Sequence, residues 1–255
     1  MIKWKLVWTT IPFMLIMVGL IYVRDYILRI QPLVALGDVT EILAAVSLIL
    51  GLMLAGVLSD YKDSERIPGD LAVVLEGLGD NVESVTSDGK TPGLAGLRFA
   101  MRDLVVTVDD WLERRVELDA LHLSMAHFRQ ALRAAASDVS ESFTGRCLDA
   151  LNNLRAPVMR ADVIMHTSFL PAGYALMYLL VAVTLILLLS AEYPSPSAEY
   201  LLVSSLSLIY IFMLRLVRDL DDPFGYGTSK RHGGSAEVSP YPVVRYRQRL
   251  EAEDT

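Results

Sequence analysis

The sequence is poor in the residues on which most covalent and metal chemistry depends. It has one cysteine, Cys147, in 255 residues, so no disulfide can form within the chain and no cysteine-based metal site within one subunit. A lone buried cysteine most often acts as a small hydrophobic residue. The four histidines are scattered: His122 and His127 are five residues apart, whereas a zinc pair on one helix face is spaced by four. We therefore expect no metal centre.

The sequence also lacks the motifs of the common classes of active site. It contains no G-x-x-x-x-G-K-[ST] phosphate loop, no G-x-S-x-G nucleophile turn and no dinucleotide-binding fingerprint. Gly77-Leu78-Gly79 lies inside a helical pattern and needs no phosphate to explain it. We expect no catalytic residue and no cofactor, so the chain is interpreted as a protein that is not an enzyme.

Positive charge is scarce. The chain has 23 Lys and Arg against 30 Asp and Glu, a formal net charge of −7. The excess is local, because residues 59–166 hold 12 Lys and Arg against 18 Asp and Glu, a balance of −6. An acidic chain of this kind is a poor ligand for a phosphate backbone, and we exclude nucleic acid as a partner.

Hydrophobic residues, in contrast, make up 53% of the chain, and the mean hydropathy is +0.40. They gather in four stretches, each long enough to cross the hydrocarbon core of a bilayer as a helix. These predicted spans cover residues 6–23, 40–58, 169–190 and 200–217. The basic and then apolar N-terminus resembles a signal peptide, but no small-residue cleavage site follows it, so we expect a retained span.

The basic residues predict an orientation in the membrane. The loop AEYPSPSAEY between the last two spans carries Glu192 and Glu199 and has no Lys or Arg. Most basic residues near the span ends lie on the other side, so both termini and the long central region are expected in the cytoplasm, as in a protein of the bacterial inner membrane. Arg24 and Arg29, in the first external loop, are exceptions to this rule.

The second span, which runs directly into a charged segment, is the one around which we expect the others to be arranged. Two stripes lie side by side on it, a small-residue stripe that lets helix backbones approach closely in lipid and an aliphatic stripe. The first consists of Ser47, Gly51, Ala55 and Ser59, and the second includes Leu48 and Leu52. These flanks suit the inner wall of an oligomer, although a buried helix of a monomeric bundle would show the same pattern.

The central region has apolar residues at helical spacing, which predicts four amphipathic helices and a helical-bundle core. Pro68 and Pro92 are placed where a first helical turn tolerates proline, and Ser87-Asp88-Gly89 predicts a turn between them. The C-terminal segment, with Gly233, Gly234, Pro240 and Pro242, is expected to be extended.

The sequence therefore predicts an all-α polytopic membrane protein with four parts. They are an N-terminal pair of spans (1–58), a cytoplasmic helical region (59–166), a C-terminal pair of spans (167–218), and a junction followed by a polar tail (219–255).

Three stretches beside the spans resemble those of the bestrophin and bestrophin-like ion channels. DLDDPFG, at residues 219–225, resembles the acidic-x-x-Asp/Asn-Pro-Phe-Gly signature that follows the last span of that family. YKDSERIPGDL, at 61–71, is similar to the stretch after the family's pore helix, and HTSFLPAGY, at 166–174, to the entry of its third span. The resemblance covers the transmembrane parts and both junctions.

The resemblance implies a homopentamer of four-span subunits that encloses one axial pore. In the family's register the hydrophobic neck of the pore falls on Ala44, Leu48 and Leu52, where the family usually has bulkier Ile and Phe. The junction after the last span comprises Asp219, Asp221, Asp222, Pro223, Phe224 and Gly225. The dense acidic run of the animal calcium clasp does not follow Gly225, so we expect no calcium gating; the three aspartates fit solvated helix-end acids or cation ligands equally well.

We therefore predict a passive channel for monovalent ions that lies in lipid and assembles with copies of itself. Asp60, Asp63 and Glu65 follow the second span and, repeated around an axis, would form acidic rings that favour cations. The same acids could instead pair with Lys62 and Arg66, and the lumen could be walled by the Ser47 stripe instead of the Leu48 stripe. The alternative function is a non-conducting membrane scaffold or sensor whose cytoplasmic helices bind a partner protein.

Overall fold

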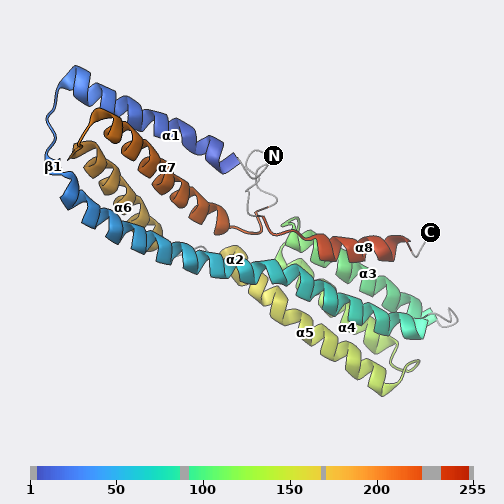
Figure 1. Cartoon of the computed structure of the whole chain (residues 1–255). Coiled ribbons are helices and arrows are strands. Elements are labelled where there is room, and N and C mark those ends of the chain that lie inside the picture. The colour runs from blue at the N-terminus through green and yellow to red at the C-terminus, as the bar shows by residue number, and fades with distance from the viewer. Residues whose placement is uncertain (1–4, 87–91, 168–170, 226–236, 253–255) are drawn as a thin grey trace. The chain divides into compact units, whose positions relative to one another are not determined.

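The computed structural model describes residues 5–86, 92–167, 171–225 and 237–252. The chain forms two compact units, which are treated separately (Figure 1). One, here called the membrane unit, consists of Met1–Tyr61 and Ser168–Asp222. The other, the extramembrane unit, consists of Lys62–Thr167 and Pro223–Thr255.

The membrane unit contains the apolar helices. Its elements are α1 (Lys5–Tyr22), the π-helix η2 (Val23–Leu28), the strand β1 (Val34–Ala35), the first part of α2 (Leu36–Thr86), α6 (Pro171–Ser190), the strand β2 (Ala191–Glu192) and α7 (Pro196–Leu220). Within the described residues, four helices are long and apolar enough to cross a membrane, and they contain the predicted spans except for residues 169 and 170, which lie outside the described residues. The all-α fold class with four spans is confirmed.

The helix α2 is one continuous helix of 51 residues. The prediction that a helix starts at Pro68 is wrong, because Pro68 lies inside α2. Proline removes one backbone hydrogen bond from a helix interior, but the apolar face continues in phase past it, and Ile67 and Leu71 are both buried. The other proline behaves as predicted, since α3 begins at Pro92. The turn predicted at Ser87–Gly89 lies outside the described residues.

Aliphatic side chains of three helices make a core in the membrane unit. Met17 and Ile21 of α1 pack with Leu188 of α6 and Val203 of α7. The helices α1 and α7 lie side by side along their length in Figure 1. Nevertheless, only 17 to 28% of each span is buried within the chain, so most of the span surface is left for lipid or for other copies of the chain.

At one end of the spans, two short strands join the connecting loops. The strand β1 pairs with β2 in parallel, with Val34 opposite Ala191 and Ala35 opposite Glu192. The backbone N–H of Leu33 also donates to the carbonyl of Ser190 at 2.9 Å. Backbone groups that leave the helices at this end are therefore satisfied within the protein.

The extramembrane unit is a bundle of amphipathic helices. It comprises the second part of α2 with α3 (Pro92–Leu112), α4 (Leu118–Ala134), α5 (Glu141–His166) and α8 (Tyr241–Ala252). The predicted apolar faces point into its core, as shown by fully buried Leu75, Leu104, Phe128 and Phe143. Ser140 caps α5, because its hydroxyl accepts a hydrogen bond from the N–H of Phe143 at 3.2 Å.

Cys147 lies in this core with no exposed surface. Burial raises the pKa of its thiol to about 11, so the thiol stays protonated and unreactive at neutral pH. Its interpretation as a small hydrophobic residue agrees with this environment.

The prediction of an extended C-terminal tail is wrong for its last part, because residues 241–252 form α8. Pro242 falls in the first turn of α8, where proline is tolerated. Val243 and Tyr246, three residues apart, are buried and provide the apolar face that a helix needs. The backbone before α8 is also held, since the N–H of Val238 donates to the carbonyl of Pro223 at 2.9 Å.

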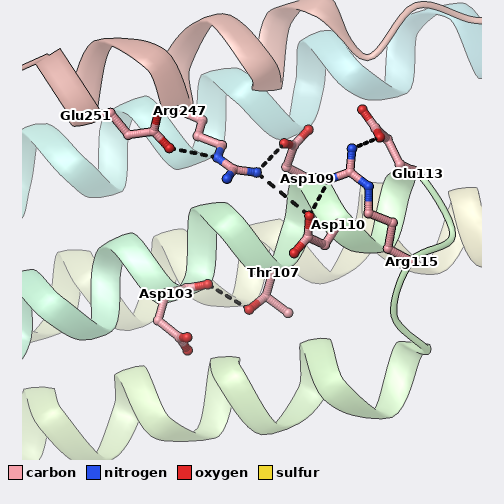
Figure 2. A network of polar contacts seen from close by, with 8 residues as sticks. All are labelled: Asp103, Thr107, Asp109, Asp110, Glu113, Arg115, Arg247 and Glu251. Atoms are coloured by element: carbon pink, nitrogen blue, oxygen red, sulfur yellow. Dashed lines mark hydrogen bonds and ion pairs between the residues drawn. The ribbon is translucent and has the colours of Figure 1, made fainter.

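Charged side chains bind α8 to α3 (Figure 2). Nη1 of Arg247 lies 2.9 Å from Oδ2 of Asp109, whose side chain is 4% exposed, and its Nε donates to Glu251 at 3.0 Å. These carboxylates, Glu251 first, raise the pKa of Arg247 above its ordinary value. A buried carboxylate without its guanidinium would be costly, so this contact specifies where α8 docks.

We predict that Gly79→Ala loosens α8. A Cβ at Gly79 of α2 would overlap the hydroxyl of Tyr246, which is 6% exposed and has little room to move. The free energy of unfolding of the extramembrane unit should fall by about 1 to 3 kcal/mol, and thermal unfolding of the purified protein measures this.

The matched control is Gly77→Ala, two residues away on the same helix, where a new Cβ meets no atom within 4 Å. It should be neutral or slightly stabilising, because alanine is the better helix former. Adding Tyr246→Phe should recover part of the loss in Gly79→Ala, since the hydroxyl is the closest atom. Equal melting temperatures for Gly79→Ala and Gly77→Ala would contradict this account of α8.

Candidate functional site

The span part of α2 has one buried side. Val39, Val46, Leu50 and Val57 recur at helical spacing and are at most 3% exposed, because they face the rest of the membrane unit. The chain thus accounts for one flank of this helix and leaves the others uncovered.

The residues of the predicted neck lie on the uncovered side. Leu48 and Leu52 are 65% and 66% exposed, and Ala44 is exposed as well. Leu48 is two residues from both Val46 and Leu50, which places it about 160 to 200° around the helix from them. The neck stripe is therefore opposite the buried side of α2.

The small-residue stripe starts between these two sides at Ser47 and turns with the helix toward the Leu48 side, because Ala55 is about 20° from Leu48 around the axis. Ser47, Gly51, Ala55 and Ser59 are all exposed as residues, and a Cβ added at Gly51 would meet nothing within 4 Å. Ser47 nevertheless has a partner in its own chain, because its hydroxyl lies 2.7 Å from that of Tyr210 on α7. Tyr210 also donates to the carbonyl of Leu43 at 3.2 Å. The Ser47 end of the small-residue stripe therefore faces α7, and the Leu48 stripe faces away from α7.

The three acids predicted to form rings are exposed. Asp60 belongs to the end of the membrane unit, and Asp63 and Glu65 to the extramembrane unit. Oδ2 of Asp63 lies 3.0 Å from Nη2 of Arg160 on α5, a pair in which both side chains are about half exposed. Since exposed ion pairs are weak, this contact lowers but does not cancel the field of Asp63.

The junction predicted after the last span has two different environments. In the membrane unit, Asp221 accepts a hydrogen bond from the hydroxyl of Tyr174 on α6 at 2.8 Å. Asp219 and Asp222 also have partners, so none of the three acids is a free ligand. In the extramembrane unit, Pro223 is buried and Phe224 has no exposed surface, while Gly225 is half-buried.

A polar cluster that the sequence alone did not reveal lies at the opposite end of the spans. The guanidinium of Arg24 on η2 lies 2.5 Å from Glu199 of α7 and 2.6 Å from Asp25, and it also donates to the carbonyl of Leu189 at the end of α6. The side chains of Arg24 and Glu199 are only 13% and 9% exposed.

The charge of Arg24 is thus neutralised within the protein, which removes one exception to the predicted orientation. The acid Glu199, near the start of the last predicted span, was the sequence signal that could have found this pair. Beside the cluster, burial raises the pKa of Tyr193 to about 12, and its hydroxyl donates to the carbonyl of Leu188 at 2.8 Å.

The rest of the described chain offers little for chemistry. No group of three or more His, Cys, Asp or Glu side chains that could hold a metal ion occurs in the described ranges. A cavity of about 190 Å³ between α2, α3 and α8 in the extramembrane unit is lined by charges of both signs. One acid and one base of this cavity, Glu76 and Arg249, already pair with each other.

Comparison by sequence finds no relative: no family model matches the chain, and no curated protein matches it. Comparison by structure is informative. Crystal structures of a bacterial bestrophin homologue from Klebsiella pneumoniae, carrying single mutations, superpose with TM-scores of 0.72 and 0.71 at 12% identity. They cover 97% and 98% of this chain and 99% of theirs. The crystal structure of a protein described only as a membrane protein gives a TM-score of 0.73 at 12% identity, over 97% of this chain and 98% of the other.

The chain therefore has a bestrophin-like fold over nearly its full length, and the resemblance seen in the sequence is confirmed at the level of the fold.

We predict that Phe224→Ala lowers the free energy of unfolding by about 3 to 5 kcal/mol and weakens assembly, because it empties a fully buried site. Thermal unfolding and oligomer retention in detergent measure the two effects. Met159→Ala shortens a side chain of α5 that is 47% exposed, so it should affect the unfolding temperature much less. If Phe224→Ala unfolds and assembles as the wild type does, the junction is not an anchor.

Proposed function

Starting from a bestrophin-like fold with four candidate spans, we propose that this protein is a passive ion channel, assembled as a homopentamer around an axial pore lined by α2. The proposal includes insertion in the bacterial inner membrane with both termini in the cytoplasm, as the distribution of basic residues favours.

The observation that carries the proposal is the exposure of the Leu48 stripe opposite the buried side of α2. A helix in the centre of a monomeric bundle would be covered on both sides, so the exposure leaves this side of α2 to other copies of the chain or to lipid. The small residues Gly51 and Ala55 flank the stripe and allow neighbouring helices to approach closely. Copies of α2 packed through this flank would turn Leu48 and Leu52 toward a common axis.

The extramembrane unit independently supports self-association. Val73 of α2, Phe99 of α3 and Leu123 of α4 are 71%, 66% and 71% exposed. They belong to the extramembrane unit, so their exposure is not explained by contact with lipid. A contiguous patch of such side chains marks a protein–protein contact, and we take these three as parts of one. Other copies of the chain would cover them in a ring.

Leu48 and Leu52 would close the pore as a hydrophobic constriction. A narrow apolar passage expels water, and an ion cannot follow without losing its hydration shell. Such a gate needs no charged residue inside the membrane, where a charge is expensive. Its opening requires only that the constriction widen or become wetter.

Cations are the proposed permeant ions. Residues 59–166 carry a balance of −6 per subunit, or about −30 in a pentamer. Carboxylates such as Asp60 and Glu65 just below the span would raise the local cation concentration within a Debye length of about 8 Å. The second span itself contains no Lys or Arg that would favour an anion.

A non-conducting scaffold or sensor is the second candidate function. Exposed Phe99 and Leu123 would also suit the surface of a partner protein. Current through planar bilayers that contain only the purified protein separates the two functions, since a scaffold passes none.

We predict that Leu52→Ser raises the resting conductance several-fold, because a hydroxyl at the constriction lets water remain there. Single-channel recording in planar bilayers measures this. Ser47→Ala, on the flank that faces Tyr210, is the matched control and should change the conductance little. If correctly assembled Leu52→Ser conducts no more than the wild type, the gate lies elsewhere.

We also predict that the reversal potential in a KCl gradient lies toward the potassium potential. Asp60→Asn and Asp63→Asn should reduce this cation preference, the second by less, because Arg160 already offsets part of the Asp63 charge. Arg160→Gln should increase the preference by releasing Asp63. A wild-type reversal potential near that of chloride would rule out the cation proposal and leave channel function itself intact.

A further inference from the structure

A charged side chain lies within one of the spans, away from the pore helix. Arg215 of α7 is five residues before the end of the helix at Leu220, about 7.5 Å along its axis. Its guanidinium carbon lies 5.0 Å from the centre of the Phe13 ring on α1, a cation–π contact. Phe13 is itself 44% exposed, so this pair lies at the surface of the membrane unit.

Arg215 has no acidic partner in the membrane unit. No ion pair or hydrogen bond joins Arg215 to a carboxylate in the described part of the chain, and the remaining residues of this unit, 1–4 and 168–170, include no Asp or Glu. Arg218, one turn further along α7, is exposed and likewise has no such ion pair among the described residues. Of the junction acids, Asp221 accepts a hydrogen bond from Tyr174, and Asp219 and Asp222 also have partners of their own.

An unpaired guanidinium at this depth needs an anion. A charge within hydrocarbon is expensive, and a long arginine side chain near a helix end extends to the membrane surface, where lipid phosphates lie. The planar guanidinium binds phosphate with two hydrogen bonds. Trp8, five residues before Phe13 on α1, is 70% exposed, as expected of an aromatic side chain at the headgroup level.

We propose that Arg215 and Arg218, with Phe13 holding the first of them, bind the phosphate of an anionic phospholipid at the end of the spans where α1 begins and α7 ends. Two guanidinium groups favour a lipid with net negative charge over a zwitterionic one. Phe13 fixes the Arg215 side chain on the outer surface, and the acyl chains would lie along the exposed residues of α1. This site does not depend on ion conduction.

The test uses the full-length protein in detergent. Phosphatidylglycerol is titrated into the protein, with phosphatidylcholine in parallel, and the rise in melting temperature and the number of bound lipids by native mass spectrometry are recorded. Phosphatidylglycerol should bind more tightly. Arg215→Gln and Arg218→Gln should each weaken its binding about fivefold, and Phe13→Leu about two- to fivefold.

The matched control is Arg133→Gln, at an exposed arginine of α4 in the extramembrane unit, which should bind phosphatidylglycerol as the wild type does. Inorganic phosphate at the same concentration should not raise the melting temperature. If it does so as well as the lipid, the site binds a free anion and the lipid proposal is wrong.

Two further outcomes would overturn the proposal. One is that the wild type binds the two lipids with equal affinity, or that Arg215→Gln binds phosphatidylglycerol as tightly as the wild type does. The other is loss of oligomer in Arg215→Gln with lipid binding unchanged, which would assign this surface to a second copy of the chain. Because none of these readouts is a current, the lipid site and the channel function can fail independently.

Discussion

The hydrocarbon core of a membrane offers no water, and every polar group of the membrane unit has to find its partner in the protein or at the membrane surface. The helices solve this for the backbone. For side chains, the solutions are specific pairs: Ser47 with Tyr210, Thr10 with the carbonyl of Leu6, and Arg24 with Glu199. The contacts of Ser47 and Arg24 join different helices and so fix how those helices are rotated about their axes, whereas the Thr10 bond lies within α1.

The rotation of α2 has the largest consequence for function. Ser47 is held against α7, and the valine and leucine side chains at 39, 46, 50 and 57 are buried. The leucine stripe is therefore left on the opposite side, where the described part of the chain does not cover it. The proposed channel uses this uncovered side as the wall of its pore.

The extramembrane unit follows different rules, because water is available to its surface. Its core is aliphatic and aromatic. Its charged contacts lie at the edge of this core, where the ion pair of Arg247 and Asp109 attaches α8 to α3. The long helix α2 contributes to both units, and its second part carries Gly79, against which the Tyr246 side chain packs. The C-terminal helix thus belongs to the folded unit, and not to a loose tail.

Much of this could be predicted from the sequence, for a simple reason. Spans are about 20 apolar residues long and amphipathic helices repeat every 3.6 residues, so the all-α class, the four spans and the buried faces of the bundle follow from local patterns. Three short stretches, of which Asp219–Gly225 is the most specific, also indicated the bestrophin-like fold, which the structural comparison then confirmed at 12% identity.

The predictions that were wrong concern features of the structure that tertiary contacts determine. The continuity of α2 through Pro68 depends on packing on both sides of the proline, and α8 is stabilised by a carboxylate 138 residues away in the chain. The pairing of Arg24 with Glu199 joins residues 175 apart. The sequence by itself determined which segments are long and apolar enough to span a membrane and which faces of the bundle helices are apolar, because those properties are local. Only the tertiary structure decided which side of each span is covered and that the C-terminal segment folds as a helix, because these depend on neighbours distant in the chain.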